Sequence, residues 1–245
     1  MLPAITFMPK IYRSMSRLPL ASIVIEREKY ISVYDPRNKI PVYVYERLSR
    51  NSLKGKASRR GVSFSEDISL PFPMRAKPLD YKNSGFSRAH MCRAAHCKKS
   101  LKVMRESFLM TNVCPKIQAL NQGHWLRLEN WVLRELKSHD FIESFSGGAF
   151  LPEVCQDGKR RVSYEVIGES NVAVPTHFFK SLYFHKSGSI TNRAFLFPNR
   201  RFLKDVSLQS FETTVDHIEK VTGLIFGAEA LFYPINYEDR EESEE

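Results

Sequence analysis

Four polar side chains in the middle of the chain are of the types that hydrolyse phosphodiester bonds. Arg88 and His90 are two residues apart, so in an extended segment their side chains point to one side. Asn121 and Glu129 follow, and on a helix their spacing offsets them by about 80°, two turns apart. Hydrolysis needs a base that takes a proton from water and positive charge near the phosphate oxygens. A histidine, an arginine and two oxygen donors for a hydrated divalent ion could supply both.

Three of these four residues also have an ordinary structural interpretation. A histidine is more often a surface or satisfied polar group than a catalytic base. Asn121 alone would be a helix cap. Glu129 alone would be a solvated carboxylate or the ion-pair partner of a neighbouring basic residue on its helix. Residue types and spacing alone therefore leave both interpretations open.

The segments that must position these residues differ in how clearly they predict structure. Residues 30–34 and 41–45 predict a β-hairpin, because β-formers flank the turn residues Asp-Pro-Arg-Asn. Residues 49–78 are basic and then rich in proline and serine, which predicts a long surface loop. The apolar run 108–113 predicts a buried strand, and residues 120–137, with apolar side chains at helical spacing, predict a helix.

The last third of the chain predicts more strands and one further helix. β-type runs are expected at residues 161–167, 172–174, 177–184 and 194–198. Residues 208–221 predict an amphipathic helix, with Ser207 as its N-cap and Gly223 as its C-cap. Strands mixed with segregated helices predict an α+β fold.

The charge of the chain favours an anionic partner. The formal net charge of the 245 residues is +10, although six of the last eight residues are acidic. A basic body favours nucleic acid or an anionic membrane surface, and the alternative is charge that only keeps the protein soluble. Stable insertion into a membrane is not expected, because no stretch of about twenty apolar residues occurs.

The four cysteines are too few to indicate a disulfide scaffold. Cys92, His96 and Cys97 could ligate a metal, but no second pair follows at the spacing of a zinc module. We therefore expect core or incidental thiols.

Several blocks of sequence resemble one known family. Residues 85–91, Gly-Phe-Ser-Arg-Ala-His-Met, resemble the Asp-Arg-Gly-His motif of the DNA/RNA non-specific endonucleases. Residues 111–115 and 120–129 resemble that family's next two blocks at suitable separations. The endonuclease G branch is resembled by residues 164–168 and 172–180, and by Arg59-Arg60 with Phe64, Glu66 and Asp67. The resemblance runs from about residue 30 to residue 226.

The resemblance implies a role for each candidate residue. His90 would be the general base and Asn121 the direct ligand of the metal ion. Asn112 and Glu129 would support the metal waters and the loop that carries the histidine. Arg88 would contact the phosphate or brace the site.

A second arginine is implied by the same resemblance. Arg59 or Arg60 would stabilise charge in the transition state; the pattern does not separate them, and Arg60 is taken as the candidate. Basic residues on both sides of His90 would track the nucleic-acid backbone: Lys54, Lys56, Arg93, Lys98, Lys99, Lys102 and Arg105.

The family resemblance also implies a fold, a metal ion, an oligomeric state and a cellular location. The expected fold is the ββα-metal (His-Me finger) type, with a mostly antiparallel central sheet flanked by helices. Mg²⁺ is the expected ion, and Mn²⁺ is the second candidate. The expected substrates are DNA and RNA, and the products would carry 5′-phosphates. The protein would be a homodimer. A mitochondrial location is implied, and the basic first 25 residues resemble a weak transit segment. A secreted protein, or another compartment, is the alternative.

Three segments are expected along the chain. Residues 1–28 would form an N-terminal arm or targeting segment, residues 29–232 the endonuclease domain, and residues 233–245 an acidic tail.

Two residues depart from the family motif. Ser87 stands in place of its aspartate and Ala89 in place of its glycine. If residue 89 needs a positive φ or a close backbone approach, a methyl group there would cost on the order of 1 kcal/mol and could displace His90. The alternative hypothesis is therefore a catalytically impaired relative of endonuclease G that still binds nucleic acid.

Overall fold

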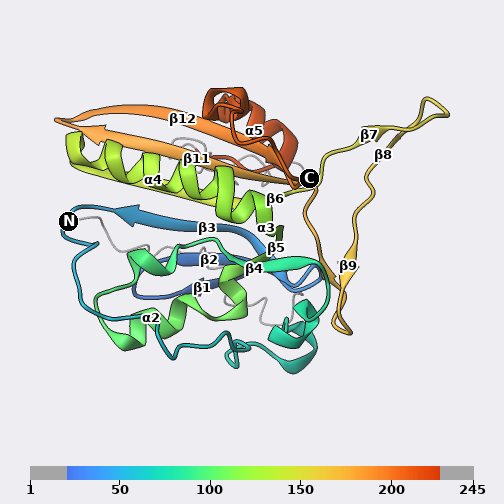
Figure 1. Cartoon of the computed structure of the whole chain (residues 1–245), viewed down its shortest axis with the longest axis horizontal. Coiled ribbons are helices and arrows are strands. Elements are labelled where there is room, and N and C mark those ends of the chain that lie inside the picture. The colour runs from blue at the N-terminus through green and yellow to red at the C-terminus, as the bar shows by residue number, and fades with distance from the viewer. Residues whose placement is uncertain (1–20, 227–245) are drawn as a thin grey trace, which may run out of the picture.

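A seven-stranded antiparallel sheet is the main feature of the computed structural model, which describes residues 21–226 (Figure 1). Its strands are, in spatial order, β1 (Ile23–Glu26), β2 (Ile31–Asp35), β3 (Ile40–Leu48), β6 (Phe141–Ala149), β11 (His177–Lys186), β12 (Ser189–Pro198) and β13 (Glu212–Thr213). The predicted hairpin is confirmed as β2 and β3. The edge strand β1 lies inside the segment expected to be an arm, so the sheet begins before residue 29. Residues 1–20 of that arm and the acidic tail lie outside the described residues.

Helices cover both faces of this sheet. Neighbouring residues of β11 point to opposite faces: Phe178 packs against Trp125, whereas Phe179 belongs to the cluster of Val215 and Ile218. The first face carries α4 (Leu126–Glu135), and the second carries α5 (Val215–Thr222). The α+β class predicted from the sequence is confirmed.

The predicted helix 120–137 is interrupted near its start. It consists of α3 (Gln118–Leu120), a π-helical turn η5 (Asn121–Trp125), α4, and a final 3₁₀ turn η6 (Leu136–Ser138). Gly123 leaves helical geometry, with φ −100° and ψ −107°. The side chain of Asn121 therefore lies on a separate turn before α4, and the ideal offset between Asn121 and Glu129 does not apply.

A small two-stranded ribbon precedes this helix. β4 (Phe86–His90) pairs with β5 (Val113–Ile117), so that Ala89 faces Cys114 and His90 faces Val113. The strand predicted at 108–113 is wrong in position, because a 3₁₀ turn η4 (Met110–Asn112) occupies its end and the strand starts at Val113. Pro115 is accommodated in β5, because a strand with one partner can leave one side without hydrogen bonds.

The two strands of the ribbon are joined through a helix that the sequence pattern did not indicate. This is α2 (Leu101–Ser107), which is preceded by a 3₁₀ turn η3 (Ala94–His96). Ser100 caps α2, since its hydroxyl oxygen accepts a hydrogen bond from the Val103 N–H at 3.2 Å. β4, β5 and the helix from α3 to α4 form the ββα unit.

The predicted long loop is confirmed, because residues 49–78 contain no strand and no α-helix. The loop includes the 3₁₀ turn η1 (Phe72–Met74) and ends at η2 (Pro78–Tyr81). An isolated parallel β-bridge between Ser65 and Leu109, and a hydrogen bond from the Thr111 hydroxyl to Asp67 at 2.7 Å, tie it to the segment after α2.

The predicted helix 208–221 is wrong in its first half. A 3₁₀ turn η7 (Leu208–Phe211) and the short β13 come first, and α5 begins only after Thr214. Thr214 rather than Ser207 is the N-cap, because its hydroxyl oxygen accepts from the His217 N–H at 3.1 Å. Gly223 is confirmed as the C-cap, with φ 74°.

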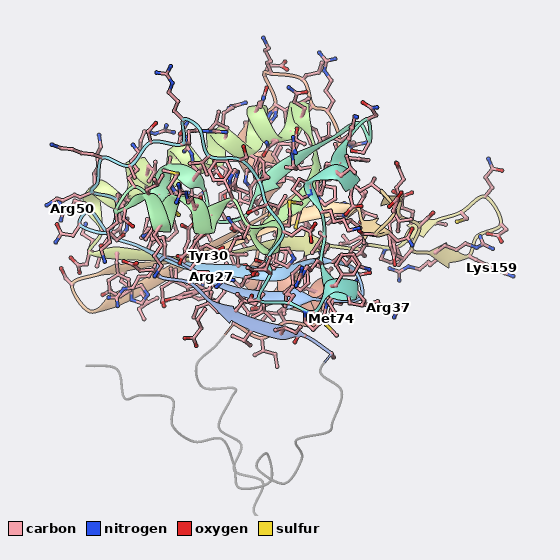
Figure 2. All side chains as sticks on the ribbon, turned by 90° about the horizontal axis from the view of Figure 1, so that it is seen from below. Arg27, Tyr30, Arg37, Arg50, Met74 and Lys159 are labelled. Atoms are coloured by element: carbon pink, nitrogen blue, oxygen red, sulfur yellow. The ribbon has the colours of Figure 1, made fainter. Side chains whose placement is uncertain are left out.

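Two short hairpins complete the chain. β7 (Glu153–Val154) and β8 (Arg160–Arg161) form an arm that extends away from the body, with Lys159 at its turn (Figure 2). β9 (Val166–Ile167) pairs with β10 (Val172–Ala173) at the base of that arm. Among the described residues no helix is long and apolar enough to cross a membrane.

Candidate active site

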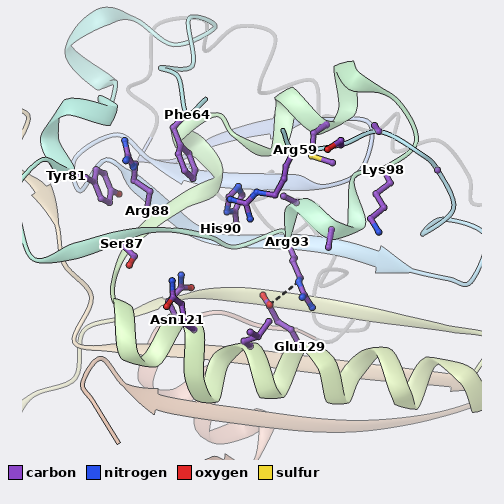
Figure 3. Close-up of a pocket in the computed structure, with 18 of the residues that line it drawn as sticks. Arg59, Phe64, Tyr81, Ser87, Arg88, His90, Arg93, Lys98, Asn121 and Glu129 are labelled. Atoms are coloured by element: carbon purple, nitrogen blue, oxygen red, sulfur yellow. Dashed lines mark ion pairs between the residues drawn. The ribbon is translucent and has the colours of Figure 1, made fainter. Parts of the chain in front are cut away.

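A cavity of about 860 Å³ lies between the β4 ribbon and the helix from α3 to α4 (Figure 3). Ser87, Arg88 and His90 line it from β4. Asn121 and Glu129 line it from the helix on the opposite wall. The candidate base and the candidate metal ligand, 31 positions apart in the sequence, therefore face one cavity.

His90 is held against aromatic side chains. Its ring centroid lies 5.0 Å from that of Phe64 and 4.7 Å from that of Phe108. Its Nε2 atom is buried without a hydrogen-bond partner among the described residues. Burial, with a smaller contribution from the positive charge of Arg59, lowers the pKa of His90 to about 4. The imidazole is thus neutral near pH 7, the form that can accept a proton.

Asn112 braces the backbone that follows His90. Its Oδ1 accepts a hydrogen bond from the Cys92 N–H at 2.8 Å. Its Nδ2 donates to the carbonyl oxygens of Cys92 at 2.9 Å and Ser107 at 2.8 Å. Asn112 is fully buried and is not among the residues that line the cavity. It can hold the histidine loop, but it does not face the space where metal waters would lie.

Asn121 and Glu129 differ in how their side chains are occupied. Asn121 begins the π-helical turn in helical geometry, with φ −58° and ψ −45°; its backbone N–H donates to the Gln118 carbonyl oxygen, and its side chain lines the cavity. Glu129 is only 8% exposed, and its Oε1 accepts from the Trp125 Nε1–H at 3.1 Å. Its Oε2 lies 3.5 Å from Nε of Arg93, which comes from the opposite wall.

These donors fit a hydrated divalent ion better than a fully protein-ligated one. Within the described residues, no group of three histidine, cysteine, aspartate or glutamate side chains could hold a metal. One amide oxygen and one carboxylate in the same cavity suit magnesium, which keeps several of its waters. Cys92 and His96, which the sequence offered as possible metal ligands together with Cys97, instead contact a buried carboxylate. The Cys92 Sγ lies 3.4 Å and the His96 Nδ1 2.9 Å from Oε2 of Glu46.

Of the two neighbouring arginines in the loop, one reaches the cavity. Arg59 lines it, with its guanidinium 5.6 Å from the Phe108 ring centroid. Both arginines are exposed, but Arg60 does not line the cavity, so the geometry favours Arg59 over the candidate chosen from the sequence. Arg88 also lines the cavity, 5.1 Å from the Phe64 ring centroid.

The two departures from the family motif lie in regular strand geometry. Ala89 sits inside β4, is 0% exposed, and is not one of the described residues with a positive φ. Its methyl group belongs to the main core cluster and not to the cavity. Ser87 lines the cavity and points toward the wall that carries Asn121 (Figure 3). The positive φ that would have made alanine a strained replacement is absent at Ala89.

Sequence reasoning missed three contributors to this site. Arg93 was grouped with residues that track phosphates, yet it contacts Glu129. Trp125 was assigned to the apolar stripe, which holds for its ring, but its indole N–H also binds Glu129. Phe108 was assigned to a strand and instead forms part of the wall behind His90. The four-residue spacing of Trp125 and Glu129 was the one signal available, since such residues are neighbours on a helix.

Comparison with known proteins gives consistent matches over most of the chain. Residues 8–231 match the sequence model of the DNA/RNA non-specific endonucleases. Mitochondrial endonuclease G of Homo sapiens is 38% identical over 210 residues, which are 85% of this chain and 71% of that protein. Mitochondrial nuclease EXOG of Homo sapiens is 35% identical over 197 residues, which are 79% of this chain and 54% of that protein.

A solved structure is also similar. It is a crystal structure of an EndoG/EndoGI complex that concerns the mechanism of EndoG inhibition. The match has a TM-score of 0.81 and 30% sequence identity, and it covers 90% of this chain and 93% of that one.

Proposed function

The chain belongs to the DNA/RNA non-specific endonuclease family, and from this membership and the cavity geometry we propose a metal-dependent endonuclease with His90 as its general base. That it is a nuclease follows from the family and its relatives. The expected mitochondrial location is confirmed by relatives that are named as mitochondrial proteins. The expected ββα-metal fold agrees with the similar EndoG structure.

The observation that carries the proposal is the placement of His90 and Asn121 on opposite walls of one basic cavity. A phosphodiester lying between them would have a base on one side and an oxygen donor for an ion on the other. Arg59 and Arg88 line the same space, where their charges can stabilise the phosphate oxygens.

His90 performs the proton transfer in this mechanism. Because Nε2 is buried, we assign Nδ1 as the atom that takes the proton from the attacking water. The lowered pKa keeps the ring neutral until that step. Asn112 holds the strand end behind the ring, so the base keeps its direction.

Asn121 is the residue proposed to hold the ion, and Glu129, which lines the same cavity, would orient the waters of the ion. A bound Mg²⁺, or Mn²⁺ in its place, would supply positive charge to the phosphate and leaving oxygens. DNA and RNA are the proposed substrates, and products with 5′-phosphates are proposed from the family resemblance. The homodimer is proposed on the same ground, and light scattering of the purified chain tests it.

Nicking of supercoiled plasmid tests the proposal. The protein should nick plasmid with Mg²⁺ and not with EDTA. His90→Ala and Asn121→Ala should lose nicking but still bind DNA in EDTA. His217→Ala and Asn192→Ala are matched controls at exposed positions and should cut normally. Failure of the unaltered protein to nick with any common divalent ion, while DNA binding persists, would support the impaired relative instead.

A further inference from the structure

One guanidinium spans the cavity from wall to wall. Arg93 follows β4, and its Nε lies 3.5 Å from Oε2 of Glu129 on α4. Its Nη1 donates to Oδ1 of Asn130 at 2.9 Å. Arg93 thus contacts two consecutive residues of the opposite wall, as Figure 3 shows for Glu129.

The backbone of Arg93 is fixed relative to His90. Arg93 comes three residues after His90, and both backbone groups of the intervening Cys92 are bound by the Asn112 side chain. The carbonyl oxygen of Arg93 accepts from the His96 N–H at 2.8 Å, which closes the turn that follows. A short, hydrogen-bonded segment therefore connects the base to this arginine.

Glu129 depends on Arg93 for one of its two oxygens. Trp125 holds Oε1 from within the same helix, and Arg93 approaches Oε2 from across the cavity. The carboxylate is only 8% exposed, so little water can replace a lost partner. A hydrogen bond on Oε1 and an ion pair on Oε2 thus hold the carboxylate from two sides.

We propose that Arg93 is a positioning residue, which sets the spacing between the His90 wall and the α4 wall and fixes the orientation of Glu129. This inference rests on the proposed function, because it takes His90 and Glu129 as parts of one catalytic site. Arg93 acts through these residues and needs no contact with the scissile phosphate. Two atoms of its fork are already directed at Glu129 and Asn130, which favours positioning over phosphate binding.

Steady-state kinetics separate the two roles. Arg93→Met keeps the length of the side chain but removes its charge and donors; it should lower kcat by roughly tenfold or more, with KM for DNA changed less than about threefold. Arg93→Lys restores the charge and should recover part of kcat. Arg134→Met removes an equal charge from an exposed position of α4 and should leave kcat unchanged. A raised KM with unchanged kcat in Arg93→Met would overturn the inference.

Two metal-free measurements complete the test. In EDTA, the salt dependence of DNA binding should be the same for Arg93→Met as for the unaltered protein, whereas loss of a phosphate contact would reduce the slope by about one. Thermal unfolding in EDTA should show that Arg93→Met and Glu129→Gln are not additive, because each removes the same contact. A reduced salt slope or additive unfolding effects would each contradict the positioning role.

Failure of this inference is distinguishable from failure of the proposed function. If His90→Ala still cuts DNA, the proposed mechanism is wrong whatever Arg93 does. If His90→Ala is inactive and Arg93→Met behaves like Arg134→Met, only the inference about Arg93 is wrong.

Discussion

Replacing Ala89 by glycine restores the glycine of the family motif, with Ser87 unchanged, and the structure predicts that this change weakens the protein without activating it. Ala89 is fully buried in β4, opposite Cys114. Glycine inside a strand costs about 0.5–1 kcal/mol in backbone entropy. The lost methyl group removes about 0.8 kcal/mol of burial. The expected loss of unfolding free energy is therefore about 1–2 kcal/mol.

Thermal unfolding measures this loss. For a domain of this size, 1 kcal/mol corresponds to roughly 2–4 °C, so Tm should fall by about 2–8 °C. The rate of plasmid nicking, measured well below Tm, should stay within about twofold of the unaltered protein, because the methyl group faces the core and not the cavity. A tenfold faster Ala89→Gly variant, or one with an unchanged or higher Tm, would show that alanine strains β4 and that this reasoning is wrong.

Other groups in and behind the site give three further predictions. Arg59→Met removes a charge that lowers the pKa of His90, so the acid limb of kcat/KM against pH should move to higher pH; an unmoved limb would contradict this. Lys116 is buried without a hydrogen-bond partner, and its pKa is lowered first by burial. Lys116→Met should therefore stabilise the protein in urea by roughly 1–3 kcal/mol at pH 7, partly offset by the lost contact with Trp125. Because the pKa of Lys116 is lower in the folded than in the unfolded chain, the unfolded chain binds more protons below pH 10, so the gain should shrink as pH rises toward 10; a gain that grows would refute the assignment. Asn112→Ala leaves buried backbone groups of Cys92 unpaired and should cost roughly 2–5 kcal/mol in thermal unfolding, together with activity; lost activity at unchanged stability would indicate direct contact with the substrate instead.

The elements that sequence predicted well are those whose pattern is local. The β2–β3 hairpin has its own turn, and Gly223 ends α5 because glycine adopts the left-handed conformation there. β4 was not indicated as a strand, because its residues face a cavity on one side and the core on the other, and only Ala89 among them is buried. The break at Gly123 was also hidden, since a glycine in a helical pattern does not reveal which φ and ψ it adopts.

The residues of the candidate site also differ in whether a local sequence pattern could identify them. His90 and Asn121 came from motifs of a few residues, and they face one cavity. The contact between Arg93 and Glu129 joins residues 36 positions apart, and only the folded chain brings them together. The choice between Arg59 and Arg60 likewise depends on the path of a loop without regular structure, which no local pattern encodes.

The central claim is that His90 is the base of a metal-dependent nuclease, and single-turnover cleavage of bound plasmid tests it most directly. With the protein in excess over plasmid, at a concentration that saturates binding, and with Mg²⁺ present, His90→Ala should cleave at least about 100-fold more slowly than the unaltered protein. Its affinity for the same plasmid in EDTA should be unchanged, which separates chemistry from binding. A variant that binds equally well and cleaves at the unaltered rate would contradict the account.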